Sequence, residues 1–511
     1  MSRGRWVVVI LMAWAASMGW LVKREFFRTT GERLAEAALA VPPGTMFYRV
    51  DQAGQQVGFA SITVDTTGTA LSVSDVLLLE FPVLGRLHRT RVRSRATVNR
   101  ALRVQTLEVL FDGDEGRLLA RGEVKGDSVL RMTLASAGDS QTTRIPLLQP
   151  IVLTTLLPLR LAFGGALKPG RTFEARVLDP VELAERDVRA TIAAESTLVV
   201  PDSAAFDSTV MAWTAVHFDT VRAFRIEERS QGLTTNVWID AQGHIVRVAG
   251  PVGLTMERTE YEIAYQNFRH RDVTRLVRGS AEPGRGAIIP ITALAARVPL
   301  PTRSDAMYRA VLTGADLSGL DLTGGRQERA GDTLIVRRET AAALAAAYRL
   351  PARDSGVASW LAAQPLIQSA DPRMRTAAHE ILGDEADPGR AAERLTHWVA
   401  ARVRREATLG LPNAVRVLTE KRGDCNELTV LYVALARAAG LPARPVAGLL
   451  EVGGRFYYHA WPEVYLGQWV AVDPLLNQFP ADAGHLRFIV GGLARQTQLS
   501  RFIGRLKVEG L

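Results

Sequence analysis

Residues 421–474 read KRGDCNELTVLYVALARAAGLPARPVAGLLEVGGRFYYHAWPEVYLGQWVAVDP, and this stretch decides how the C-terminal part of the chain is interpreted. It contains Cys425, the only cysteine in 511 residues, followed by His459 and Asp473. A thiol, an imidazole and a carboxylate are the groups of a Cys-His-Asp nucleophilic site, in which the imidazole activates the thiol and the carboxylate orients the imidazole. We therefore predict Cys425, His459 and Asp473 as catalytic residues. The alternative is that Cys425 is a buried, inert cysteine.

Cys425 is predicted to be the first residue of a helix. Asp424 is a suitable N-cap residue, and Glu427 completes a capping-box pattern. Gly440 and Pro442 then end the helix. A thiol in the first turn lies at the positive end of the helix dipole, which favours the thiolate, and the free backbone N–H groups there can bind an oxyanion. We therefore expect Cys425 to have a low pKa.

The second half of the stretch has the pattern of two strands joined by a short turn that contains glycine. With a three-residue loop at residues 465–467, Val464 pairs with Gln468, and His459 lies directly opposite Asp473. Facing Cβ atoms are then about 4.5–5.5 Å apart, which lets the carboxylate orient the imidazole. A two-residue loop would place the two side chains on opposite faces of the sheet. The catalytic interpretation therefore requires the three-residue register.

These motifs carry a family resemblance. The pattern GDC-x-E, an apolar helix ending AxGLPARxVxG, a strand with HAW-x-EVY and then W-V-x-V-DP resembles the catalytic core of the bacterial transglutaminase-like superfamily, whose members share the papain-like cysteine-protease fold plan. The resemblance spans roughly Asp354 to His485. It implies Cys425 as the nucleophile, His459 as the base and acid, and Asp473 as the residue that orients His459. The sequence has no acidic cluster like the calcium sites of the animal cross-linking enzymes, so we expect no calcium, no other metal and no cofactor.

The first 25 residues have the composition of a membrane anchor. Residues 6–22 carry no charge, and basic residues flank them on both sides. This length is at the lower edge for a membrane-spanning helix, and no well-placed cleavage site precedes Lys23. We therefore expect an uncleaved transmembrane helix at residues 1–25. The protein would then be single-pass in the inner (cytoplasmic) membrane, with most of the chain in the periplasm or another extracytoplasmic space. A cleaved signal peptide is the alternative.

The remaining chain is predicted to be a multidomain α+β protein. Residues 45–275 contain short alternating strands separated by Gly, Asn and Asp, which is typical of a β-rich domain. After a linker, residues 287–350 have the pattern of a second, small β domain. Residues 354–511 form the expected transglutaminase-like catalytic domain of the papain-like α+β type. The expected fold class is therefore a transmembrane helix, two β-rich parts and one α+β domain.

Charge restricts the choice of partners. The net charge of +9 is mild for this length and no dense block of Lys and Arg occurs, so nucleic acid is an unexpected partner. Four arginines share one face of a predicted strand, and we interpret them either as a solvated face or as a surface for lipid head groups or an acidic polymer. These residues are Arg89, Arg91, Arg93 and Arg95.

The sequence favours a thiol-dependent amide hydrolase of the cell envelope, a peptidase or amidase that acts on a protein or peptide. Attack on an amide carbonyl would give a thioester, which water or an amine then resolves. Hydrolysis is preferred because water is the default acceptor unless the site excludes it. Two alternatives remain open: a protein cross-linking transglutaminase, and an envelope binding or assembly factor that retains the fold without catalysis.

Overall fold

The computed structural model describes two long segments of the chain, residues 43–274 and residues 306–510. Within them it leaves out residues 53, 68–69, 84–85, 100, 115, 127, 137–138, 148, 165–166, 180–183, 231, 251–252, 407–410, 453–454 and 503–504.

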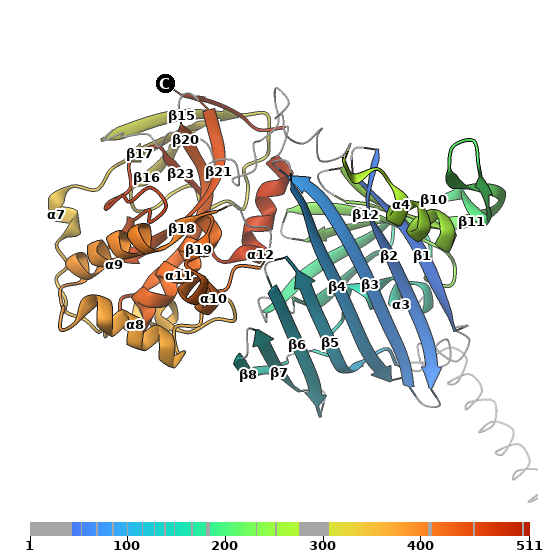
Figure 1. The fold of residues 1–511 in the computed structure, drawn as a ribbon, viewed down its shortest axis with the longest axis horizontal. Helices are drawn as coiled ribbons and strands as arrows, with labels where there is room; N and C mark the ends of the chain where they lie inside the picture. Colours follow the sequence, from blue (N-terminus) through green and yellow to red (C-terminus); the bar gives the residue numbers. More distant parts are fainter. Residues whose placement is uncertain are drawn as a thin grey trace, which may run out of the picture.

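The first segment is built on one antiparallel sheet of fourteen strands (Figure 1). Strands β1 to β8 follow one another outward to one edge, the chain then crosses to β9 at the other edge, and β9 to β14 return until β14 pairs with β1. The strands are β1 (Gly44–Gln52), β2 (Gln55–Thr67), β3 (Ala70–Val83), β4 (Arg86–Asn99), β5 (Val104–Gly113), β6 (Gly116–Lys125), β7 (Val129–Ser136), β8 (Asp139–Pro146), β9 (Thr172–Asp179), β10 (Ala184–Asp207), β11 (Ala212–Ser230), β12 (Leu233–Ile239), β13 (Ile245–Ala249) and β14 (Leu254–Thr259).

A short apolar helical segment fills the space between the two halves of this sheet. It consists of η2 (Thr154–Leu156) and α3 (Leu157–Phe163). Leu156 and Leu159 pack with buried residues of β2 to β7 and β9, whereas Leu157 and Leu161 pack with buried residues of β9 to β12. The alternation of apolar and polar side chains along the strands therefore gives one covered face of the sheet. Two further helical turns, η4 (Glu262–Gln266) and α4 (Asn267–His270), follow β14.

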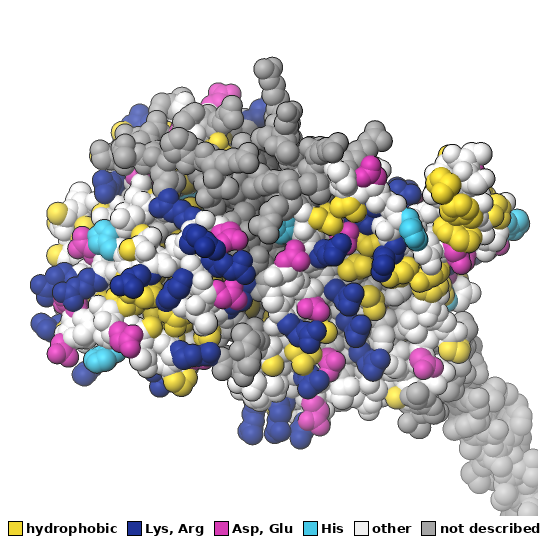
Figure 2. All heavy atoms as spheres, in the orientation of Figure 1, with side chains coloured by type: hydrophobic (Ala, Val, Ile, Leu, Met, Phe, Trp, Pro, Cys, Tyr) yellow, Lys and Arg dark blue, Asp and Glu magenta, His cyan; other side chains and the backbone are white. Residues whose placement is uncertain are grey.

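Two surface features of the sheet are conspicuous (Figure 2). The arginines at positions 89, 91, 93 and 95 are all exposed on β4, and Arg89 forms an ion pair with Glu80 at 2.8 Å. Their shared face is as expected, and anion binding there remains a prediction. The long β10–β11 hairpin, which projects at the right of both views, carries exposed hydrophobic side chains. These are Val199, Phe206, Val210, Met211, Val216 and Phe218.

The second segment is a helix–sheet unit in which α11 (Cys425–Ala438) packs against a four-stranded antiparallel sheet of order β22-β21-β20-β23. Twelve of the fourteen residues of α11 are buried, so this helix is the centre of the core. The sheet comprises β20 (Ala443–Val452), β21 (Arg455–Tyr465), β22 (Trp469–Ala471) and β23 (His485–Val490). The other helical elements are α7 (Ala341–Leu344), η5 (Ser355–Leu361), α8 (Pro372–Leu382), α9 (Pro388–Arg402), α10 (Ala414–Glu420), α12 (Leu493–Gln496) and η6 (Thr497–Phe502).

Strands β15 (Met307–Thr313), β16 (Gln327–Ala330) and β17 (Thr333–Arg337) share a core with this unit. Their buried residues, Ala310 and Leu334 among them, belong to the same hydrophobic cluster as α8, α9 and α11. The C-terminal strand β24 (Lys507–Gly510) pairs with β15, so the end of the chain returns to this small sheet. The short β18 (Arg404–Arg405) and β19 (Arg422–Gly423) pair in parallel before α11. Domain boundaries at 287–350 and 354–511 remain predictions.

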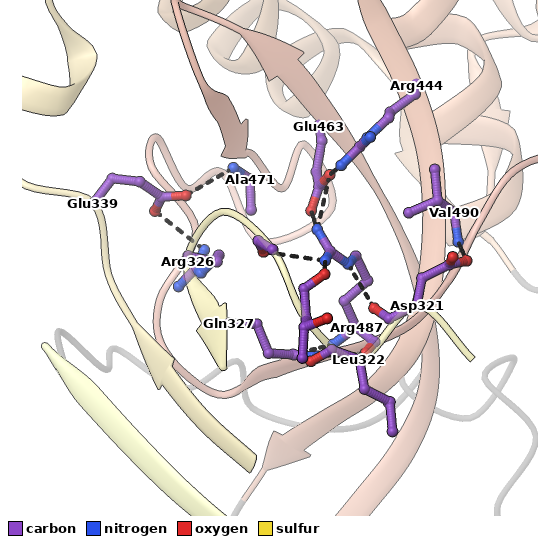
Figure 3. Close-up of polar contacts among 12 residues, drawn as sticks. Asp321, Leu322, Arg326, Gln327, Glu339, Arg444, Glu463, Ala471, Arg487 and Val490 are labelled. Atoms are coloured by element: carbon purple, nitrogen blue, oxygen red, sulfur yellow. Dashed lines mark hydrogen bonds and ion pairs between the residues drawn. The ribbon is translucent and has the colours of Figure 1, made fainter. Parts of the chain in front are cut away.

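A buried network of hydrogen bonds and ion pairs connects residues 321–327 to the four-stranded sheet (Figure 3). Glu463, which is 1% exposed, accepts hydrogen bonds from Arg444 Nε at 2.8 Å and from Arg487 Nη1 at 3.0 Å. Arg487 also donates to the backbone oxygens of Asp321 and Thr323. The single carboxylate thus pairs with two guanidinium groups, and breaking a buried pair of this kind would be costly.

The expected fold class is wrong in its membrane component. The described chain is rich in strands, and among residues 43–274 and 306–510 no helix is both long and apolar enough to cross a membrane. The stretch 1–25, on which the expectation of an anchor rested, lies outside the described residues. The interpretation as a single-pass inner-membrane protein is therefore corrected.

Removing Glu463 is expected to destabilise the C-terminal unit. Glu463→Ala leaves Arg487 buried without its partner, so the free energy of unfolding should fall by about 3–5 kcal/mol. The control is Glu328→Ala, which removes the exposed partner of Arg337 and should cost less than about 1 kcal/mol. Urea unfolding followed by tryptophan fluorescence measures both. Equal losses in the two variants would contradict the role of the buried network.

Candidate active site

The start of α11 has the predicted capping box. The Asp424 side chain accepts the N–H of Asn426 at 2.8 Å, and Glu427 accepts the N–H of Asp424 at 3.3 Å. Cys425 is therefore fixed as the first residue of the helix, and it is 2% exposed. Gly440, just after the helix, has φ +80°, the left-handed conformation expected at a helix end.

His459 and Asp473 are in direct contact. His459 lies on β21 with its side chain fully buried, and its Nε2 is 2.7 Å from Oδ2 of Asp473. Trp461 stacks beside the imidazole, with ring centroids 5.8 Å apart and an interplanar angle of 24°. The contact between the imidazole and the carboxylate is therefore held in place by packing and is shielded from water.

The predicted hairpin register is wrong by two residues. Tyr465 pairs with Trp469, and the last pair of the ladder is Glu463 with Ala471. The loop is thus residues 466–468, with Gly467 at φ +95°. A shift of two preserves the face of a strand, so Asp473 still lies on the same side as His459. It reaches His459 from beyond the end of β22 and does not face it across the ladder.

The carboxylate of Asp473 has four hydrogen-bond donors. Oδ1 accepts the backbone N–H groups of Leu475 at 2.8 Å and Leu476 at 3.1 Å, and Oδ2 accepts from both His459 and His485. Burial alone would raise the pKa of Asp473, but the charges and hydrogen bonds of the two histidines hold it well below its usual range. Asp473 is consequently ionised under ordinary conditions.

The sequence did not point to His485, the first residue of β23. Its Nε2 is 3.0 Å from Asp473 Oδ2, and its Nδ1 is 2.9 Å from Oδ1 of Asp482. Burial opposes protonation of this imidazole, but the two carboxylates raise its pKa to about 9. No spacing motif connects His485 or Asp482 to the catalytic pattern. Only the fold of β23 against β20 brings them to Asp473.

The prediction that Cys425 has a low pKa is wrong. Burial raises the pKa of the Cys425 thiol well above its ordinary value, and the Asp424 and Glu427 carboxylates raise it further, whereas a hydrogen bond from the Ala460 N–H lowers it. These two capping groups oppose the helix dipole at Cys425, and burial together with the charge of Glu427 also raises the pKa of Asp424. A thiolate therefore has to form by transfer of the thiol proton to a nearby base.

His459 has the tautomer needed for such a base. Its Nε2–H donates to Asp473, and its buried Nδ1 has no hydrogen-bond partner among the described residues. The Cys425 thiol accepts a hydrogen bond from the backbone N–H of Ala460, the residue next to His459. The charge of Asp473 also raises the pKa of this thiol. The unoccupied Nδ1 is thus the atom that can accept the proton of Cys425.

A cavity of about 310 Å³ adjoins the first turns of α11. Asn426 and Thr429 contribute to its wall, and the Thr429 hydroxyl is buried without a hydrogen-bond partner in the described structure. Its other walls include Trp360, Pro445, Leu493 and Gln496. Gln496 also accepts a hydrogen bond from Tyr458 at 2.9 Å, which joins α12 to the strand of His459. Cys425 itself does not line the cavity, which reaches the nucleophile's helix through its neighbour Asn426.

His459, Asp473 and His485 are also the side chains with the residue types of a metal site. Their candidate ligand atoms lie within 4.8 Å of one another. The two nitrogen–oxygen distances, 2.7 Å and 3.0 Å, are those of hydrogen bonds. Neighbouring ligands of a tetrahedral zinc ion are about 3.3 Å apart, given zinc–nitrogen bonds of about 2.0 Å. The observed arrangement is therefore that of a hydrogen-bonded chain.

Residues 375–474 match the family model of the transglutaminase-like superfamily, and this match contains Cys425, His459 and Asp473. An uncharacterized protein of Haemophilus influenzae is 34% identical over 98 residues, which are 18% of this chain and 26% of that protein. The chain thus matches about a quarter of the length of that relative. Residues 375–474 are thus similar to the transglutaminase-like superfamily, the resemblance that the sequence motifs indicated.

Two solved structures resemble the chain more distantly. A candidate cysteine protease from Cytophaga hutchinsonii has 16% identity and a TM-score of 0.28, and the match covers 42% of this chain and 78% of that one. A DUF1089 family protein from Pseudomonas aeruginosa has 9% identity and a TM-score of 0.22, with 38% and 89% covered.

Loss of His459 is expected to slow alkylation of Cys425. Because the pKa of this thiol is raised and the imidazole is its base, His459→Ala should reduce the iodoacetamide labelling rate at pH 7 by about 100-fold or more. The protein has one cysteine, so mass spectrometry of the intact chain reports Cys425 alone. His397→Ala, which removes an exposed histidine bonded to Asn477, is the control and should label at the normal rate. Equal rates in the two variants would show that His459 is not the base.

Proposed function

We propose that the chain is a thiol-dependent enzyme that cleaves amide bonds of a protein or peptide, with Cys425, His459 and Asp473 as its catalytic residues. The observation that carries the proposal is the orientation of His459, whose Nε2–H is held by Asp473 while Nδ1 is left without a partner. A base in this tautomer is what a cysteine nucleophile requires. The transglutaminase-like match over residues 375–474 supports the same class of enzyme.

The reaction begins when Nδ1 of His459 takes the thiol proton of Cys425 and the sulfur bonds to the amide carbonyl carbon. The backbone N–H of Cys425, which has no partner within α11, can stabilise the oxyanion. The imidazolium then gives its proton to the leaving amine as the carbon–nitrogen bond breaks, which leaves a thioester. Water attacks the thioester while His459 takes one of its protons, and the carboxylic acid leaves as the thiol is restored.

A second candidate is transfer of the acyl group to an amine, the reaction of a cross-linking transglutaminase. The burial of all three residues favours it: Cys425 is 2%, His459 0% and Asp473 1% exposed. A site that excludes water can keep a thioester long enough for an amine to enter. Hydrolysis requires only water and remains the preferred proposal.

The acceptor can be identified directly. Glutamine-containing peptides incubated with the protein should give the free acid, and adding a labelled primary amine should give less amide product than acid. Mass spectrometry of the peptides measures both products, and Cys425→Ala should give neither. If labelled amide forms faster than acid, acyl transfer replaces hydrolysis as the proposed reaction, and the assignment of the nucleophile stands.

The carboxylate of Asp473 is expected to be essential for turnover. In Asp473→Asn an amide N–H₂ replaces one oxygen, so the residue loses the charge and the acceptors that fix the tautomer of His459, and turnover should fall by roughly 10⁴-fold. Asp384→Asn, at an exposed aspartate in the same unit, should retain full activity. Circular dichroism compares the folding of the two variants. Activity in a folded Asp473→Asn protein near that of the control would contradict the role given to Asp473.

A further inference from the structure

Beyond Asp473 the hydrogen-bonded chain continues through two more buried side chains. His485 bonds to Asp473 through Nε2 and to Asp482 through Nδ1, at 3.0 Å and 2.9 Å. His485 is 1% exposed and Asp482 3% exposed. His459 and His485 share one oxygen of Asp473, so the two imidazoles lie on the same carboxylate, with ring centroids 5.6 Å apart.

The contacts of His485 require both of its nitrogens to carry protons. Each ring nitrogen faces a carboxylate oxygen, and the backbone oxygen of Asp482 lies 3.2 Å from Nδ1. These groups only accept hydrogen bonds, and a neutral imidazole has a single N–H. A neutral ring would therefore point a lone pair at one of the two carboxylates. The raised pKa of His485, about 9, agrees with this geometry.

Asp482 is held in place by its own partners. It accepts the Nε2–H of Gln478 at 2.9 Å and the backbone N–H of Gly484 at 2.9 Å, and its own N–H donates to Oε1 of Gln478. Burial would raise the pKa of Asp482, but the hydrogen bond and the charge of His485 lower it to about 2. The residue is thus a fixed negative charge behind His485.

We propose that His485, kept positively charged by Asp482, is a positioning residue of the active site. It sets the pH range in which the proton shared by Cys425 and His459 lies on the imidazole. This inference rests on the proposed function of Cys425, His459 and Asp473. His485 does not touch the reacting atoms. It acts through Asp473, whose negative charge it partly balances.

The partial compensation of the Asp473 charge by His485 has a direct consequence for His459. Asp473 alone would strongly stabilise the protonated form of His459. A second imidazolium, that of His485, on the same carboxylate oxygen weakens this stabilisation. His459 can then return its proton to the leaving amine, which the acid step requires.

Other charges surround this chain of residues and stay constant in the test below. Arg405 interacts with Asp473, and Arg326 interacts with Asp482. Asp424 and Glu427 face Cys425 from α11. Replacing His485 removes one charge from Asp473 and leaves the residues that carry these other charges unaltered.

The test is the pH dependence of Cys425 alkylation by iodoacetamide, compared between the unaltered protein and His485→Gln. In the unaltered protein the rate should show an acid limb for loss of the thiolate and an alkaline limb for loss of the imidazolium proton. Removal of one nearby positive charge should move both limbs upward by about one pH unit or more. His397→Gln, at an exposed histidine, is the control and should move neither limb.

A merely structural role for His485 predicts another result. The labelling rate of His485→Gln would then fall or rise at every pH while both limbs stayed in place, and the proposal would be overturned. If the unaltered protein shows no limb that depends on His459, the proposed function and this inference both fail. Limbs that depend on His459 but do not move in His485→Gln overturn this inference alone.

A second measurement needs no variant and therefore does not depend on the folding of His485→Gln. The protein has eight histidines, and ¹⁵N NMR of the histidine-labelled protein reports the protonation of every ring. One ring is expected to keep both protons up to about pH 9, the value indicated for His485. If all eight rings lose a proton by pH 8, His485 is not a permanent imidazolium and the proposal is wrong.

Discussion

The buried carboxylate of Asp473 is the constraint on which the rest of the C-terminal unit depends. An ionised group with 1% exposure is stable only when donors replace the water it has lost, and the effective cost of failing to do so is several kcal/mol. Its four donors come from three separate parts of the chain: β21 through His459, β23 through His485, and the turn at Leu475 and Leu476. All three must be in place together. The candidate active site and the fold around it are therefore specified by the same interactions.

The same burial determines how a reactive thiolate can arise. A helix N-terminus offers about half a positive charge, but the carboxylates of the capping box, Asp424 and Glu427, offset it at Cys425. A fully formed charge next to the sulfur acts more strongly than this partial one, because the surroundings have a low dielectric constant. In the proposed mechanism the imidazolium of His459 is such a charge, and it forms when His459 takes the thiol proton. In that mechanism the proposed nucleophile and base change state in one step, which differs from the permanently acidic thiol that the helix position alone predicts.

Local chemistry explains what could be predicted from the sequence. The capping box at Asp424 and Glu427 and the end of α11 at Gly440 involve residues close in the chain, and the structure has both as expected. The hairpin register depends on distant packing: Trp469 contacts Tyr465 and lies under the guanidinium of Arg444, which Glu463 binds. The loop accordingly lies one residue later than predicted, and each residue pairs with a partner two positions further along β22. His485 meets Asp473 only through the pairing of β23 with β20, for which the sequence has no local signal. Hydropathy at residues 1–25 predicted a transmembrane helix, and no described helix has the required length and apolar character.

The closeness of β20 to β23 gives Gly448 a specific importance. Gly448 pairs with His459 on one side and with Arg487 on the other, so its backbone lies between the two strands that carry the imidazoles. A Cβ at this position would be 1.9 Å from the backbone oxygen of Leu486, which is closer than real Cβ atoms approach. Any larger residue would therefore push β23 away from β20. His485 would move off Asp473, and Arg487, two residues along the same strand, would move off Glu463. The absence of a side chain at Gly448 thus lets β23 complete both the hydrogen-bond chain of the candidate site and the buried contacts of Arg487 that hold residues 321–327.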